Sequence, residues 1–232
     1  MRESDIPGIR ELELFSTMSE ETFARLFRGA YVQTFPPQVE LTTEGDPADF
    51  LHVLVSGRVE LHARWNRRET SMATVRPVST FILAATIKDA PYLMSARTMR
   101  KSRIVLLPSA DVRAAFEADH GFARAVVLEL ATAYRSAVKT TKNLKLRNSQ
   151  ERLANYLIRC RRREGGSPVF RLEIEKRRLA SYLGMTPENF SRAIRALRPY
   201  GVEIDGPEVR ITDMEALLSL ARPNPLIDDY AT

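Results

Sequence analysis

The sequence predicts an α+β chain with an N-terminal β-roll of the jelly-roll kind, a long dimerisation helix and a C-terminal winged helix-turn-helix. Three observations lead to this prediction. Short alternating strands separated by Gly and Pro turns run from residue 30 to residue 108. A long helical pattern follows them. Beyond it, two short helices and a hairpin occupy residues 176–211.

The β-roll is preceded by residues 1–28, whose apolar spacing predicts helices, with Ser19 as a cap. The segment 50–55 alternates as a strand should, and we expect it to end at Ser56-Gly57. We then expect residues 58–62 to pair back along it. The remaining strands that the pattern indicates are residues 31–35 and 103–107.

The helical stretch from Asp111 to Arg147 carries apolar residues in alternating steps of four and three, which is the spacing of a coiled-coil seam. It predicts a parallel dimer helix. The seam consists of Val126, Leu130, Ala133, Ala137, Thr140 and Leu144. A second apolar set could pack the same helix onto the roll, namely Val127, Leu128, Tyr134 and Val138.

A new helix is expected from Ser149 to Arg163, because Asn148 and Glu151 have the spacing of a capping box. We place a hinge at residues 145–148. Residues 202–211 read as a hairpin with Asp205-Gly206 at its tip.

The most informative stretch is the predicted helix-turn-helix of residues 176–195. Gly184 suits a helix end, and Thr186 followed by Pro187 suits the start of the next helix. Two short helices joined in this way place the second in a major groove of DNA.

The second helix would turn polar side chains outward. Arg192 suits a guanine edge, Glu188 suits a cytosine amino group, and Ser191 suits a base or a phosphate. The full predicted DNA-binding set is Glu188, Ser191, Arg192, Arg195, Thr186, Arg198, Lys176 and Arg178. The alternative is a surface helix on which Glu188 and Arg192 form only an i,i+4 salt bridge.

The charge distribution supports a nucleic-acid partner. Residues 135–210 hold 18 Lys and Arg against 8 Asp and Glu, a local charge of +10, so the remainder carries −4 of the overall +6. The single cysteine, Cys160, is expected to be a buried structural thiol, since one cysteine supports no disulfide framework. No apolar run is long enough to span a membrane and no signal peptide is evident, so we expect a cytoplasmic protein.

The predicted domains are residues 1–110 for the β-roll with its N-terminal helices and 111–147 for the dimerisation helix. Residues 148–222 form the DNA-binding domain, and residues 223–232 form a flexible tail.

This order of domains resembles the CRP/FNR family of bacterial transcription regulators over nearly the whole chain. The resemblance rests on residues 44–46, 55–59, 148–154 and 183–192, the last of which is similar to the FNR-type recognition helix Glu-x-x-Ser-Arg. It implies a homodimer whose Glu188, Ser191 and Arg192 read TTGAT…ATCAA palindromes in double-stranded DNA. It also implies RNA polymerase as a partner and a cyclic-nucleotide-binding-like sensor domain.

The sensor departs from the cyclic-AMP binders of the family. Tyr92-Leu93 stands where they have Arg-Ser, and no Gly-Glu pair precedes it, so a cyclic phosphate would lose its charged clamp. An iron–sulfur cluster of the FNR type is excluded by the cysteine count. Residues 79–92 look most similar to the Dnr/NnrR branch, which responds to nitric oxide and for which haem is the proposed sensor.

An apolar effector pocket is therefore predicted, with an unknown small-molecule or gas effector; the alternative is plain core packing. Its residues are Phe81, Leu83, Tyr92, Leu93 and Met94. Haem ligation by His52, His62, His120 or Met94 would be compatible with the composition.

Three other functions compete with this one. A constitutive regulator would need no effector, and a cyclic-nucleotide-binding regulator would need the missing clamp. A metal oxygenase on the roll would need clustered ligands, but His52 and His62 lie ten residues apart with no His-x-His pair, so we expect no enzyme.

Overall fold

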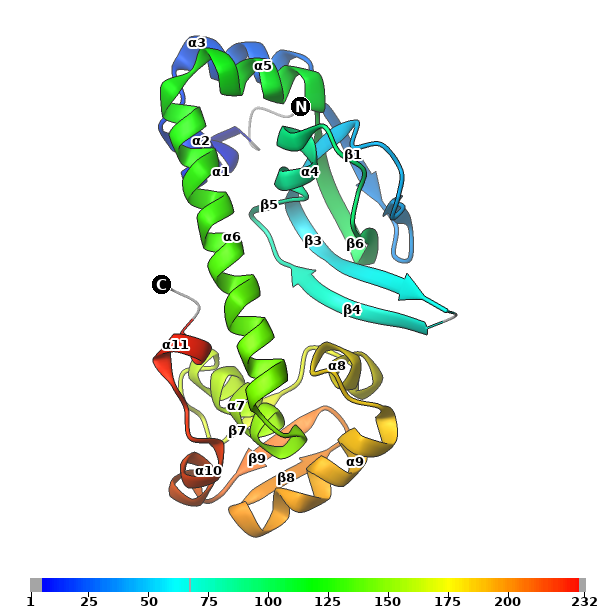
Figure 1. Ribbon diagram of the computed structural model, residues 1–232, viewed down its shortest axis with the longest axis vertical. Helices are drawn as coiled ribbons and strands as arrows, with labels where there is room; N and C mark the ends of the chain where they lie inside the picture. Colours follow the sequence, from blue (N-terminus) through cyan, green and yellow to red (C-terminus); the bar gives the residue numbers. More distant parts are fainter. Residues whose placement is uncertain (1–5, 67, 230–232) are drawn as a thin grey trace. The chain divides into compact units, whose positions relative to one another are not determined.

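The computed structural model describes residues 6–66 and 68–229, and the chain divides into two compact units, residues 1–132 and 133–232 (Figure 1). The fold is the predicted one: a β-roll with helices in the first unit and a winged helix-turn-helix in the second. The units divide earlier than the boundary at 147/148 that the sequence suggested.

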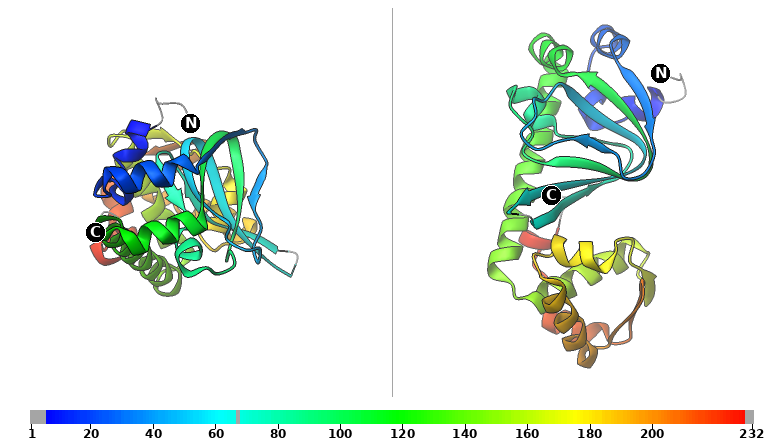
Figure 2. Two further views of the ribbon diagram at one scale, coloured as in Figure 1. Left: turned by 90° about the horizontal axis from the view of Figure 1, so that it is seen from above. Right: turned by 90° about the vertical axis from the view of Figure 1, so that its right-hand side faces the viewer.

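The first unit holds a six-stranded antiparallel sheet in which β1, β6, β3 and β4 are neighbours in that order, with β2 paired to β6 and β5 to β3. Helices α3 and α5 lie on the same side of the strands (Figure 2). Its helices are α1 (Ile6–Arg10), α2 (Glu13–Ser16), α3 (Glu20–Arg28), α4 (Leu83–Lys88) and α5 (Ser109–Ala118). Its strands are β1 (Tyr31–Phe35), β2 (Glu40–Thr42), β3 (Phe50–Trp65), β4 (Arg68–Val75), β5 (Ser79–Phe81) and β6 (Ser95–Pro108).

Two apolar clusters stabilise this unit. One joins the helices to the strands, and Phe15 and Phe122 stack at its centre with ring centroids 6.0 Å apart. The other lies among the strands and includes Leu54, Phe81 and Ile104. Strand β3 contributes side chains to both clusters, because successive side chains of a strand point to opposite faces.

The prediction that the strand ends at Gly57 and that residues 58–62 pair back is wrong. Strand β3 continues through Gly57, and residues beyond it pair with β4 and β6 across shifts in register. Gly57 forms this irregularity with φ +103°, where a Cβ would lie 2.3 Å from Ser102 Oγ. Ser102 Oγ in turn accepts a hydrogen bond from Arg58 N (3.1 Å). Gly57 therefore lies at a bulge against β6. In the sequence, a glycine at this position is equally consistent with a bulge and with a hairpin turn.

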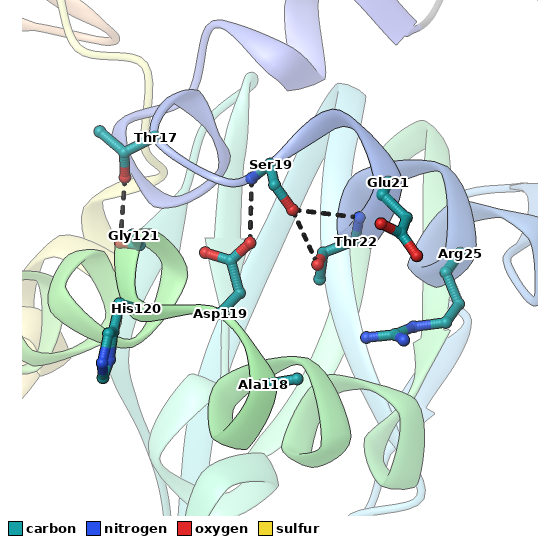
Figure 3. A pocket seen from close by; sticks show the side chains of 9 residues that line it. All are labelled: Thr17, Ser19, Glu21, Thr22, Arg25, Ala118, Asp119, His120 and Gly121. Carbon is teal, nitrogen blue, oxygen red and sulfur yellow. Dashed lines mark hydrogen bonds between the residues drawn. The ribbon is translucent and has the colours of Figure 1, made fainter.

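The predicted helix 111–147 is interrupted. Helix α5 ends at Ala118, Asp119 is extended, and α6 (His120–Leu146) begins after it. The Asp119 carboxylate accepts a hydrogen bond from Phe122 N (2.8 Å), so it caps α6. It also accepts one from Ser19 N (3.0 Å), which ties α6 to the start of α3 (Figure 3). Ser19 caps α3 as predicted.

The second unit contains the rest of α6 and a three-stranded sheet of order β7-β9-β8. Asn148 and Glu151 form the predicted capping box, and Cys160 is buried as expected. Its elements are α7 (Ser149–Arg163), β7 (Val169–Arg171), α8 (Lys176–Tyr182), α9 (Pro187–Ala196), η2 (Arg198–Tyr200), β8 (Val202–Asp205), β9 (Glu208–Ile211), α10 (Met214–Ala221) and α11 (Pro225–Asp228).

The expectation of a flexible tail from residue 223 is wrong up to residue 229. Helix α11 is formed there, Ile227 is buried, and Asp228 pairs with Arg147. Sequence pattern missed it because a four-residue helix has no periodicity and its stabilising partner is 81 residues away. Residues 230–232 lie outside the described part.

None of the helices formed by the described residues has the length and apolar character needed to cross a membrane.

Candidate nucleic-acid interface

Helices α8 and α9 meet at a tight turn, as the sequence predicted. Gly184, two residues after the end of α8, has φ +64°. Thr186 caps α9 by accepting a hydrogen bond from Asn189 N (3.2 Å), and Pro187 occupies the first helical position. Each of these residues satisfies a helix end, so the local sequence fixes where α9 begins.

The buried face of α9 consists of Phe190 and Ala193, each 3% exposed, with Leu197 completing it at the helix end. This face packs into the core of the second unit. The opposite face is exposed, and its members are Glu188, Ser191, Arg192 and Arg195, with Arg198 just beyond the helix. The predicted base readers therefore share one outward surface, called here the reading face.

Hydrogen bonds hold two of these side chains. Arg192 Nη2 donates to Asn189 Oδ1 (2.7 Å), and Ser191 Oγ donates to the Pro187 carbonyl (2.9 Å). With its proton used in this way, the Ser191 hydroxyl is left with acceptor capacity toward a ligand. The guanidinium of Arg192 keeps further N–H donors for a bidentate contact.

Glu188 is an acceptor on the same face. Its own backbone N–H, the Thr186 hydroxyl and the charge of Arg192 lower the pKa of its carboxyl. It is therefore ionised at neutral pH and suited to accept from an exocyclic amino group.

Further cations lie on neighbouring elements of the same unit. Lys176 is exposed in the first turn of α8, and Arg178 is half-buried beside it. The β8–β9 hairpin turns at Gly206, as predicted for the tip of a wing, and Arg210 on β9 is exposed.

Asn189 is a residue that sequence reasoning passed over. It lies one residue after Glu188, and its amide oxygen orients Arg192. Its position i−3 from Arg192 on a helix was the available signal, because residues three apart are neighbours on a helix surface.

The predicted dimer seam on α6 is only partly exposed. Val126 is 0% exposed and Leu130 packs beside it in the core of the first unit, so Val126 cannot belong to a dimer surface. Ala133, Ala137 and Leu144 are exposed.

The second apolar set, which the sequence suggested could pack onto the roll, lies at the surface instead. Its exposed fractions are 58% for Val127, 57% for Leu128, 71% for Tyr134 and 41% for Val138. The two sets differ by one residue, or about 100° around a helix, and packing decides between them.

The predicted effector-pocket residues do not form one lining. Phe81 and Met94 belong to the cluster among the strands, whereas Leu83 joins the helix-facing cluster. Tyr92 is buried, with its hydroxyl donating to the Phe50 carbonyl (3.3 Å). Leu93 is 83% exposed, so its inclusion in a buried pocket is wrong.

The three histidines have different surroundings. His52 is buried and stacks on Phe81 with ring centroids 4.9 Å apart. Burial lowers the pKa of His52 to about 4, and the Phe50 carbonyl opposes this only in part. His62 is buried with Nε2 3.1 Å from Glu40 Oε1, and His120 is exposed. Among residues 6–66 and 68–229 there is no group of three or more His, Cys, Asp or Glu that could hold a metal ion.

Two family models match the chain. A cyclic nucleotide-binding domain matches residues 32–119, and a Crp-like helix-turn-helix domain matches residues 151–220. The CRP-like cAMP-activated global transcriptional regulator of Mycobacterium tuberculosis is 23% identical over 215 residues, which are 90% of this chain and 96% of that protein.

Solved structures share the fold. FixK2 from Bradyrhizobium japonicum superposes with a TM-score of 0.70 at 22% identity, covering 84% of this chain and 98% of its own. DNR from Pseudomonas aeruginosa superposes with a TM-score of 0.52 at 21% identity, covering 95% of this chain and 99% of its own. With a cyclic nucleotide-binding domain followed by a Crp-like helix-turn-helix, the chain belongs to the CRP/FNR family of transcription regulators.

Proposed function

We propose that this regulator reads a TTGAT…ATCAA palindrome in double-stranded DNA as a homodimer, with Glu188, Ser191 and Arg192 contacting bases. The observation that carries the proposal is the exposure of these three side chains on one face of α9, with Asn189 holding Arg192. Two copies related by a two-fold axis would meet two half-sites of opposite direction.

The flanking residues have a different role in this proposal. Arg195, Arg198, Lys176 and Arg178 contact phosphates, and Thr186 fixes the start of the reading helix. Phosphate contacts add affinity without sequence information, so binding should fall steeply with salt.

The dimer forms along α6 through the exposed apolar set Val127, Leu128, Tyr134 and Val138. A second copy is the occupant that fits, because family members are dimeric and the proposed operator is two-fold symmetric. Ala133, Ala137 and Leu144 remain candidate neighbours of this surface.

An experiment with a matched pair of variants tests the base readers. Arg192→Ala should abolish preference for the guanine position of the half-site, a loss of about 1–3 kcal/mol. Arg195→Ala removes the same charge from the same helix and should weaken every sequence alike. Binding of both variants to duplexes with single base changes, at fixed salt, distinguishes the roles. An Arg192→Ala protein with wild-type base preference would refute the assignment.

The signal is proposed to be something other than cyclic AMP. Tyr92 is buried with its hydroxyl bonded to the backbone, and Leu93 offers no polar group where the resemblance implies a phosphate clamp. The alternative is a constitutively active regulator that needs no effector and is controlled by its own abundance. We propose the cytoplasm as the compartment and RNA polymerase as a partner, since both follow from acting on promoters.

Haem is the cofactor that the resemblance to the Dnr/NnrR branch implies. His52 is the candidate ligand because its imidazole is held neutral, which is the form that binds metals. Haem would have to displace Phe81, which stacks on the His52 ring in the core. Titration of hemin into the wild type and into His52→Ala tests this: a Soret band that depends on His52 is expected, and identical spectra would exclude His52.

A further inference from the structure

The last described residues form a structure of their own against α6. Residues 224–229, called here the C-terminal strap, contain α11. Asn224 accepts a hydrogen bond from Leu226 N (2.8 Å) and its own N–H donates to Asp228 Oδ2 (2.7 Å). Ile227 is 7% exposed. The strap is therefore capped, closed by its own polar groups and packed through one apolar side chain.

A buried ion pair joins the strap to the end of α6. Arg147 Nη1 donates to Asp228 Oδ1 and Nη2 donates to Asp228 Oδ2, both at 2.6 Å. Arg147 Nη1 also donates to Asn143 Oδ1 (3.1 Å). The two charged side chains are only 7% and 8% exposed, so removing either one would leave the other as a buried charge without its hydrogen-bonded partner. The charge of Arg159 also lowers the pKa of the Asp228 carboxyl.

The strap has two further anchors on α6. Lys139 Nζ, on a side chain that is almost fully buried, donates to the Asp229 carbonyl. Lys142 Nζ donates to the Leu226 carbonyl (3.4 Å). Lys139 and Lys142 are three residues apart and so share one side of α6, and Arg147 follows directly after the end of the helix. The strap is therefore held by the last two turns of α6 and by the residue just beyond them.

The next helix is tied to the same place. Arg152 Nη1 on α7 donates to the Arg147 carbonyl (2.6 Å), and its Nε donates to the Leu183 carbonyl (2.9 Å) at the helix-turn-helix. Asn155 Nδ2 donates to the Ala221 carbonyl (2.6 Å), just before the strap. The break between α6 and α7 is thus spanned by hydrogen bonds from both sides.

We propose that the C-terminal strap locks the end of α6 to the winged helix, with Arg147 and Asp228 as positioning residues for the reading face. The end of α6 and the winged helix that it joins both belong to the second compact unit. The junction at 145–148, which the sequence marks as a hinge, is rigid. Only the consequence for DNA rests on the proposed function.

Hydrogen exchange of the full-length protein tests the lock without DNA. In Asp228→Asn, the backbone amides of residues 145–149 should exchange at least about tenfold faster, because Arg147 loses its buried counter-charge. Glu215→Gln removes one carboxylate from the exposed surface of α10 in the same unit and should leave the wild-type rate. Equal rates in Asp228→Asn and Glu215→Gln would overturn the lock.

Four more variants keep the test decisive if Asp228→Asn is poorly folded. Asp228→Glu keeps the charge and changes its reach, so it should give an intermediate rate. The double variant Arg147→Asp with Asp228→Arg restores opposite charges, and it should exchange more slowly than either single reversal. A double variant as fast as the faster single reversal would contradict a direct pair.

Binding to the palindromic duplex separates the two proposals. With the lock broken, affinity should fall about tenfold while base preference stays, because the reading faces lose a fixed pose without losing their side chains. A wild type without base preference would refute the proposed reading of DNA and leave the exchange result standing. If the wild type prefers the palindrome but the amides of residues 145–149 in Asp228→Asn exchange at the wild-type rate, only the strap proposal is refuted.

Discussion

Two adjacent valines on α6 provide a sharp test of how this helix is used. Val126 is 0% exposed in the core of the first unit, and Val127 is 58% exposed. Replacing each by alanine removes the same two methyl groups. The position alone therefore decides whether the change affects folding or association.

The magnitudes follow from burial. Val126→Ala loses about 0.8 kcal/mol per buried carbon group. With the cavity left behind, this should lower the free energy of unfolding by about 2–3 kcal/mol. Val127→Ala should change the stability of the monomer by less than about 0.5 kcal/mol. Because two copies of Val127 would meet across a two-fold interface, the dissociation constant of the dimer should rise about tenfold.

Urea unfolding followed by circular dichroism, at a protein concentration low enough to populate monomers, measures the first effect. Sedimentation equilibrium over a range of concentrations measures the second. A weaker dimer of Val126→Ala at unchanged stability would contradict the buried position of Val126. A loss of monomer stability in Val127→Ala as large as that in Val126→Ala would contradict the exposed position of Val127.

Three further predictions concern the first unit. The pKa of His52 is about 4 in the folded state and about 6.5 when unfolded, so the unfolded chain binds the proton first as pH falls. Stability should drop by ~2 kcal/mol between pH 7 and pH 5 on this account, and urea unfolding of His52→Phe should lack that drop. Asp119→Ala should cost about 1–2 kcal/mol by removing the cap of α6, whereas Glu117→Ala on exposed α5 surface should cost little; equal losses by the same assay would exclude the cap. Gly57→Ala should destabilise by about 3 kcal/mol, since its Cβ would meet Ser102, and a neutral result would show that the bulge can relax.

The second unit was predictable because its signals are local. Gly184, Thr186 and Pro187 satisfy helix ends through groups within a few residues of one another, and so do Asn148 and Glu151. The outward position of the recognition residues then followed from helical periodicity.

The predictions were wrong where contacts between residues distant in sequence determine the local structure. Gly57 forms a bulge because Ser102 packs against it, and α11 is stabilised by Arg147. On α6 two apolar stripes offset by one residue are both consistent with a coiled-coil spacing, and only the core around Val126 selects which one is exposed. The break at Asp119 had a local signal, since Asp is a favoured cap, but the helical pattern on both sides concealed it.

The effector pocket was the least predictable part. Its residues were chosen as one apolar segment, yet the chain there turns through β5, α4 and a loop, which distribute the side chains over two cores and the surface.

We propose above all that this protein reads a palindrome through the exposed face of α9. Fluorescence-anisotropy binding of the wild type to a TTGAT…ATCAA duplex and to a scrambled duplex, at one fixed salt concentration, tests it most directly. We expect the protein to bind the palindrome at least about 30-fold more tightly than the scrambled duplex, since base contacts at two half-sites are each worth about 1–3 kcal/mol. Equal affinity for both duplexes, in the presence and absence of hemin and a nitric oxide donor, would contradict it.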